Sequence, residues 1–249
     1  MTSPDRRAEL AERLAAVRDR IAAACQAAGR PAADVTLVAI TKTFPATDVA
    51  LLASLGVTDF GENRDQEAAP KAAEVAALWE PGVRWHFVGQ LQVNKVPSVV
   101  RYADVVHSVD RLRLVRALGS RAAAAGRQIT CLIQVDLDEP APGSQAPATA
   151  AEGARGGAPP SEVLVLADAV AAQGGLELGG VMAVAPLGAQ PRPAFIELRG
   201  IARTVAAAHP GATIISAGMS GDLEDAIAEG ATHVRVGTAL LGGRPPFVR

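Results

Sequence analysis

The chain has 249 residues, with 26 acidic and 24 basic side chains and a formal net charge of −2. Because the chain has no excess of basic residues, its charge gives no indication of binding to nucleic acid or to an anionic membrane, and we expect neither as a partner. Apolar residues make up 49% of the chain, which excludes general disorder. The two isolated cysteines, Cys25 and Cys131, fit no metal-binding spacing and indicate a reducing compartment. We therefore expect a cytoplasmic protein.

The first segment reads as an amphipathic helix. Ser3 and Pro4 supply an N-cap and a first turn, and apolar residues from Leu10 to Ile21 recur at helical spacing. Charged residues interrupt every stretch that a signal peptide would need to keep apolar. We expect this helix to remain in the mature protein.

Runs rich in β-branched residues alternate with helical stretches along the rest of the chain. The expected strands are 35–42, 59–63, 85–90, 105–110, 129–138, 178–186, 213–220 and 232–240, with helical stretches at 46–55, 64–78, 93–102, 111–125 and 222–229. Strands that alternate with helices indicate parallel βαβ units. Eight units in one α/β chain predict a single (β/α)8 barrel of the TIM type over residues 1–249. A doubly wound open sheet is the alternative.

The segment 140–160 departs from this alternation. It reads PAPGSQAPATAAEGARGGAPP and has no apolar periodicity. Such composition is typical of a flexible linker, and a lid over an active site is the other interpretation. We expect 141–154 to be a flexible insertion.

Lysine is scarce, because only Lys42, Lys71 and Lys95 stand among the 24 basic residues. Lys42 ends the first expected strand, where a barrel places its functional residues. A lysine amine at the mouth of a barrel can lose its proton and attack a carbonyl carbon, which arginine cannot do. The sequence therefore indicates a Schiff-base lysine at position 42, although an edge lysine reaching towards water is the plainer interpretation.

The exits of the last two expected strands carry small and hydroxyl-bearing residues. The seventh ends in Ser216-Ala-Gly-Met219-Ser220-Gly-Asp, and the eighth carries Arg235-Val-Gly237-Thr238. Loops at these places hold phosphate in many barrels, and glycines let backbone N–H groups approach an anion. A Schiff-base lysine and a phosphate-binding loop in one site indicate a ligand with an aldehyde at one end and a phosphate at the other. Pyridoxal 5′-phosphate (PLP) has both groups. An arginine at 235 facing the pyridine nitrogen would leave that nitrogen unprotonated.

Other polar residues support two interpretations each. Glu62 and Asn63 end the second expected strand and either orient a ligand or cap a helix. The four histidines have no ligand spacing, and we expect them to be core or surface residues. Met182 and Cys131 read as core residues, the cysteine inert.

These segments resemble the YggS/PROSC family of pyridoxal phosphate homeostasis proteins. The matching motifs are LVAITKTFP, DFGENRDQE, WHFVGQLQVNK, HSVDR, ISAGMSGDLEDAIAEG and HVRVGTALLGGR, spread over residues 35–244. The resemblance implies a barrel like the N-terminal domain of alanine racemase, with PLP held as an aldimine. It implies a cofactor site made of Lys42, Asn63, Ser216, Met219, Ser220, Arg235, Gly237 and Thr238.

The chain departs from the family pattern at two places. Arg64 stands where the family often has tyrosine. The family also often has a lysine before a glycine after its fifth strand, and in this chain Arg155, which precedes Gly156, looks like the counterpart of that lysine. Lys95 is then the remaining matched lysine that a second PLP site would use.

Three functions remain open from the sequence. The first is a monomeric, non-catalytic carrier that buffers PLP and supplies it to apo-enzymes. The second is an amino-acid racemase, which needs a second base; Tyr102 is the only tyrosine, and we expect no C-terminal β-domain after Gly243. The third is a lysine Schiff-base enzyme acting on a phosphosugar without PLP. We expect the carrier.

Overall fold

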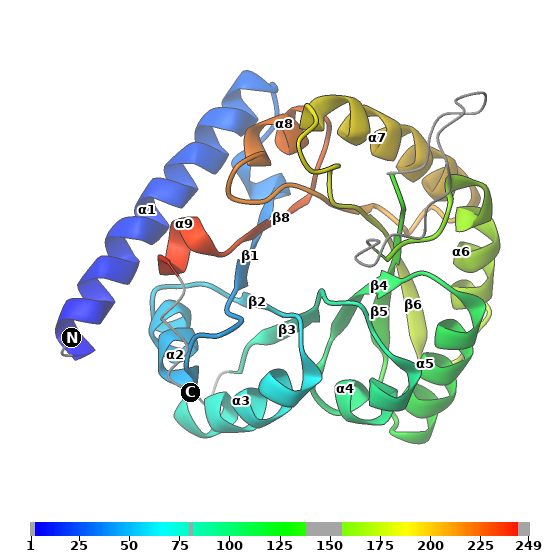
Figure 1. Ribbon diagram of the computed structural model, residues 1–249, viewed down its shortest axis with the longest axis horizontal. Coiled ribbons are helices and arrows are strands. Elements are labelled where there is room, and N and C mark those ends of the chain that lie inside the picture. The colour runs from blue at the N-terminus through cyan, green and yellow to red at the C-terminus, as the bar shows by residue number, and fades with distance from the viewer. Residues whose placement is uncertain (1–2, 80–81, 138–155, 244–249) are drawn as a thin grey trace.

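Eight parallel strands close into a barrel in the computed structural model, which describes residues 3–79, 82–137 and 156–243 (Figure 1). The strands are β1 (Thr36–Ile40), β2 (Asp59–Glu62), β3 (Arg84–Phe87), β4 (Val105–Val109), β5 (Ile129–Gln134), β6 (Leu176–Met182), β7 (Ile214–Ser216) and β8 (His233–Val236). Each strand pairs with the next, and β1 also pairs with β8, with Ala39 opposite Val236. This closing pair confirms the predicted barrel and excludes the open sheet.

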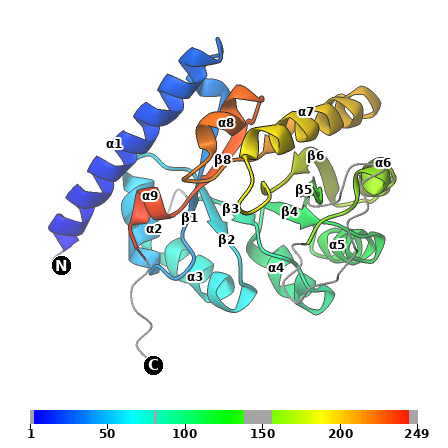
Figure 2. The same cartoon turned by 45° about the horizontal axis from the view of Figure 1, so that its top comes forward.

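Helices surround the barrel, one after each strand, with one more before β1 (Figures 1 and 2). They are α1 (Ser3–Ala27), α2 (Ala46–Ser54), α3 (Asp65–Leu78), α4 (Val96–Tyr102), α5 (Leu112–Ala124), α6 (Val163–Ala171), α7 (Pro191–Ala208), α8 (Leu223–Ala228) and α9 (Thr238–Leu241). None of these helices is both long enough and apolar enough to cross a membrane.

The long helix α1 covers the side of the barrel where α8 and α9 are short. Leu10, Leu14, Val17 and Ile21 are buried, as their helical spacing predicts. The helix contacts α2, α8 and α9 (Figure 2). α1 therefore completes the outer layer where the last two helices leave strands β8 and β1 uncovered.

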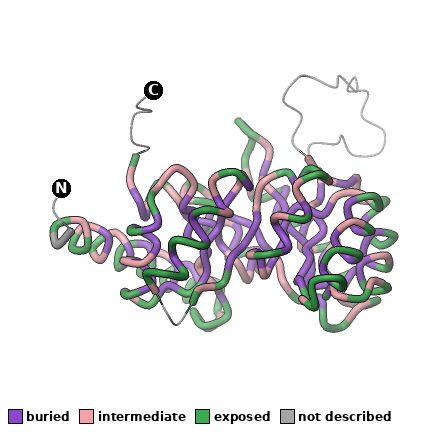
Figure 3. Tube along the Cα trace, turned by 90° about the horizontal axis from the view of Figure 1, so that it is seen from below, coloured by how far each residue is buried: buried purple, intermediate pink, exposed green. Residues whose placement is uncertain are grey.

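Burial follows the layers of a barrel (Figure 3). Apolar side chains fill the space between the strands and the surrounding helices in two large clusters. Polar and charged side chains are buried as well, among them His86, His107, Ser216 and Arg235. His107 on β4 lies within hydrogen-bonding distance of Ser216 on β7, strands that are not neighbours in the sheet. These polar groups therefore meet across the lumen of the barrel.

The structure corrects several expected boundaries, since β3, β5, β6, β7 and β8 all end three or four residues earlier than predicted. Strand β8 ends at Val236, and residues expected to continue it form α9, because a short apolar run such as Thr238–Leu241 suits a strand or a helix equally well. Strand β6 begins at Leu176, two positions before its predicted start. The expected flexible insertion 141–154 lies outside the described residues.

Candidate functional site

A cavity of about 440 Å³ lies where the strands end, at the carboxyl face of the barrel. It is lined by Ile40, Lys42, Phe44, Asn63, Val88, Gly89, Met182, Val184, Met219, Ser220, Gly221, Arg235, Gly237, Thr238 and Gly242. Every predicted site residue except Ser216 is in this wall. The cavity has the size and the mixed apolar and polar lining of a small-molecule site.

Lys42 reaches the cavity from the exit of β1. Its backbone follows the buried Thr41 and precedes Thr43, whose φ of 70° lies in the left-handed region that threonine rarely adopts. The chain therefore turns sharply after Lys42 and carries on into α2. Lys42 itself is half-buried and lines the cavity.

A buried ion pair supports the backbone beside Lys42. The Nζ of Lys71, on α3, lies 2.6 Å from Oε1 of Glu62 and donates to the carbonyl oxygen of Thr41 at 2.8 Å. The hydroxyl of Thr41 donates to the same Glu62 oxygen at 2.7 Å. Burial raises the pKa of the Glu62 carboxyl, and the ammonium of Lys71 acts in the opposite direction. The sequence offered the scarcity of lysine as its only signal for this role.

The exits of β7 and β8 present hydrogen-bond donors to the cavity. Among the described residues, no protein group accepts from the backbone N–H groups of Ser220, Gly221, Gly237 and Thr238. The hydroxyls of Ser220 and Thr238 belong to the same wall. Backbone N–H groups and hydroxyls gathered in this way can hold an anion.

Gly218 shapes this wall. It has a φ of +88°, and a Cβ there would lie 2.6 Å from the Cβ of Ala226. Only glycine therefore permits the close approach of the β7 exit to α8. The backbone that carries Ser220 depends on this approach.

Arg235 enters the cavity wall from β8. Its side chain donates to Oγ of Ser216 at 2.6 Å and to the carbonyl oxygen of Ala183 at 2.8 Å. Burial lowers the pKa of Arg235 to about 10, so the guanidinium stays charged at neutral pH. Ser216 is buried behind Arg235 and does not line the cavity.

The donor set fits PLP. An amine, a group of anion-binding donors and a guanidinium share one cavity whose other walls are apolar, including Ile40, Val88 and Met182. PLP offers an aldehyde, a phosphate and a flat ring to these groups. Met182 is nearly fully buried, as core packing predicts, and still forms part of the cavity wall.

Lys95 lies outside this cavity. It lines a neighbouring pocket of about 490 Å³ with Arg64 and several amide side chains, and Asn63 belongs to both pockets. A second PLP site at Lys95 stays a prediction. Within the described ranges, no group of three histidine, cysteine or acidic side chains could hold a metal ion.

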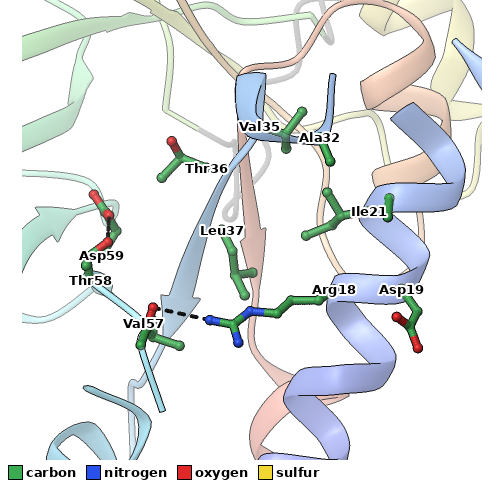
Figure 4. A pocket seen from close by; sticks show the side chains of 12 residues that line it. Arg18, Asp19, Ile21, Ala32, Val35, Thr36, Leu37, Val57, Thr58 and Asp59 are labelled. Carbon is green, nitrogen blue, oxygen red and sulfur yellow. Dashed lines mark hydrogen bonds between the residues drawn. The ribbon is translucent and has the colours of Figure 1, made fainter. Parts of the chain in front are cut away.

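A further pocket of about 530 Å³ opens at the opposite end of the barrel (Figure 4). It lies between α1 and the beginnings of β1 and β2, and Asp59 is in its wall. Arg18 crosses it and donates to the carbonyl oxygen of Gly56 at 3.2 Å. It shares no residue with the cavity that contains Lys42.

Comparison with known proteins identifies the family of the chain. Residues 13–245 match the model of the family described as alanine racemase, N-terminal domain. A protein of Mycobacterium tuberculosis named pyridoxal phosphate homeostasis protein is 44% identical, over 97% of this chain and 95% of that protein. A protein of Escherichia coli with the same name is 35% identical, over 95% of this chain and 97% of that protein.

Solved structures show the same relationship. PipY of Synechococcus elongatus, solved with PLP bound, is 33% identical with a TM-score of 0.77, and the match covers 94% of this chain and 100% of PipY. Alanine racemase of Corynebacterium glutamicum shares the fold, with a TM-score of 0.63 at 15% identity over 91% of this chain and 60% of the enzyme. The chain therefore belongs to the alanine racemase N-terminal domain family and, within it, to the pyridoxal phosphate homeostasis proteins.

Proposed function

We propose that this protein binds PLP covalently through Lys42 and acts in PLP homeostasis. The observation that carries the proposal is the cavity that Lys42 shares with four backbone N–H groups, which have no acceptor in the part of the chain that the structure describes. PipY, which is 33% identical to this chain, has been solved with PLP bound. Relatives over nearly the full length of the chain are named pyridoxal phosphate homeostasis proteins.

Each part of the cavity has a role in this proposal. PLP supplies an aldehyde carbon, to which the Lys42 amine forms a C=N bond with release of water. Ser220, Gly237 and Thr238 donate to the phosphate, with Met219 and Gly221 completing that wall. Arg235 faces the ring nitrogen and, as a permanent cation, disfavours its protonation. Asn63 lies beside the ring, and Ser216 acts through Arg235.

An unprotonated ring is a weak sink for electrons, so this arrangement suits holding PLP more than broad amino-acid chemistry. The racemase alternative requires a second base against the ring, and the only tyrosine, Tyr102, does not line the cavity. Burial raises the pKa of the Tyr102 hydroxyl, with nearby Asp65 acting in the same direction. The Tyr102 hydroxyl therefore stays protonated and lies outside the cavity wall, so it is a poor candidate for that base.

Absorbance and reductive trapping test the proposal. The purified protein is saturated with PLP, its visible spectrum is recorded, and borohydride reduction is followed by peptide mapping. We expect one reduced adduct, on Lys42, which the Lys42→Ala variant lacks and the Lys95→Ala variant keeps. A reduced adduct on another lysine, or on none, would overturn the assignment.

Handover of PLP is the finer part of the proposal. We infer that the protein works as a cytoplasmic monomer and delivers PLP to apo-enzymes. The loaded protein is mixed with an apo-enzyme in the presence of a scavenger of free PLP, and recovery of enzyme activity is followed. Recovery that the scavenger abolishes would show release into solution in place of direct transfer. Light scattering on the loaded protein measures its oligomeric state.

A further inference from the structure

Five buried or nearly buried polar side chains form one line through the barrel. Asp59 Oδ1 lies 2.8 Å from Nε2 of His86, whose Nδ1 lies 2.8 Å from Nε2 of His107. His107 Nδ1 lies 3.0 Å from Oγ of Ser216, which is 2.6 Å from Nη1 of Arg235. We call this set the lumen chain. It joins the cavity that contains Lys42 to the pocket at the opposite end, where Asp59 lies in the wall (Figure 4).

The ends of the lumen chain determine its direction. A guanidinium only donates, so Ser216 Oγ accepts from Arg235. Ser216 is fully buried, and among the described residues the only acceptor within reach of its hydroxyl proton is Nδ1 of His107. His107 therefore carries its proton on Nε2 and donates it to His86. His86 in turn carries its proton on Nε2 and donates to the Asp59 carboxylate.

The reverse direction is the less favourable arrangement. It needs a protonated His86 that donates to His107, which then donates to Ser216. The Ser216 hydroxyl would be left without an acceptor in a buried place, which is costly. It would also add a second cation to a lumen that already holds Arg235, with Arg84 and His233 acting on the same groups. Burial lowers the pKa of His107 well below its ordinary value, which agrees with a neutral ring.

We propose that Asp59, His86 and His107 are positioning residues for Arg235, because they fix Ser216 as its acceptor and so hold the guanidinium against the ring end of the cofactor. This inference rests on the proposed function. The lumen chain reaches from a carboxylate to a guanidinium, so each hydrogen bond in it is oriented by charges of opposite sign at the two ends. The lumen chain links Arg235 to Asp59 through three intervening side chains, whereas the carboxylate whose charge raises the pKa of Arg235 directly is Asp222.

The histidine tautomers of the protein without PLP provide the first test. The chain has only four histidines, so nitrogen-15 spectra of the imidazoles can be assigned with single variants. We expect His86 and His107 to be neutral Nε2–H tautomers at pH 7. A proton on Nδ1 of His107, or a charged His86, would overturn the inference, and neither outcome depends on PLP binding.

Ligand affinity provides the second test. His107→Phe keeps Ser216 and Arg235 in place, and His233→Phe is the matched control, since His233 lies in the lumen beside His86 but outside the lumen chain. We expect His107→Phe to weaken PLP and phosphate-free pyridoxal by the same factor, up to about tenfold, the usual effect of losing one hydrogen bond between uncharged groups. Unchanged affinity, or a loss confined to PLP, would overturn the inference.

The two proposals fail in different ways. A wild-type protein that binds neither PLP nor pyridoxal contradicts the proposed function while the tautomer experiment still tests the direction of the lumen chain. A protein that binds both and responds equally to His107→Phe and His233→Phe contradicts the positioning role alone. If His107→Phe does not fold, His107→Leu takes its place, because leucine also removes the acceptor of the Ser216 hydroxyl.

Discussion

The ammonium group of Lys71 donates a hydrogen bond to the carbonyl oxygen of Thr41, one peptide before Lys42. One lysine of this chain thus holds the backbone from which another reaches the cavity. Lys71 comes from α3 and Lys42 from the exit of β1, so the bond ties a helix to the strand that carries the reactive amine.

Replacing Lys71 tests how much its interactions with Glu62 and Thr41 contribute to the stability of the protein. Lys71→Met leaves the Glu62 carboxylate buried without its cation, so we expect a loss of about 3–5 kcal/mol in the free energy of unfolding, measured by urea denaturation. Lys95→Met is the control and should change little. Combining Lys71→Met with Glu62→Met should recover part of the loss, and strict additivity of the two changes would contradict the pairing.

The phosphate wall has its own test. Thr238→Val removes one hydroxyl donor, and we expect PLP to bind about 1–3 kcal/mol less tightly in an equilibrium titration. Pyridoxal, which lacks the phosphate, should bind the variant as it binds the wild type. A parallel loss for both ligands would place Thr238 away from the phosphate.

Acid should destabilise the fold through the histidines of the lumen. Burial lowers the pKa of His233 to about 4 and that of His107 well below its ordinary value, whereas both titrate near pH 6.5 in the unfolded chain. Between these values the unfolded state binds more protons, so the free energy of unfolding falls as the pH falls from about 6.5 towards 4. Urea midpoints across this range measure the slope, which His233→Phe should make shallower; an identical slope would contradict the assignment.

The two cysteine thiols should not react with thiol reagents in the folded protein. Cys25 and Cys131 are both buried, and burial raises the pKa of Cys131 to about 12 and that of Cys25 above its ordinary value. We expect a chromogenic disulfide reagent at pH 8 to label neither cysteine in native buffer and both in urea. Fast labelling of the native protein would show local opening around β5 or α1.

The sequence predicted the barrel because strand and helix periodicities are local properties. The rule about strand ends, together with the family resemblance, predicted seven of the fifteen residues that line the cavity. The sequence did not predict which polar side chains form hydrogen bonds with one another in the lumen of the barrel. His86 and His107 read as ordinary core or surface residues, since nothing in β3 or β4 indicates that His86 contacts His107 or that His107 contacts Ser216 across the barrel. Lys71 was equally hidden, because a helix position nine residues after Glu62 carries no sign of reaching back to β1. Contacts between distant elements depend on packing, and that information is spread over the whole chain.

The small number of lysines has a chemical consequence for a carrier of a reactive aldehyde. Aldehydes attach slowly and indiscriminately to exposed amines, and most proteins offer many. In this chain Lys71 forms a buried ion pair with Glu62, and most of the basic residues are arginines. Lys95 is therefore the one remaining lysine besides Lys42. An excess of the aldehyde therefore meets few lysine amines that compete with Lys42 on this protein.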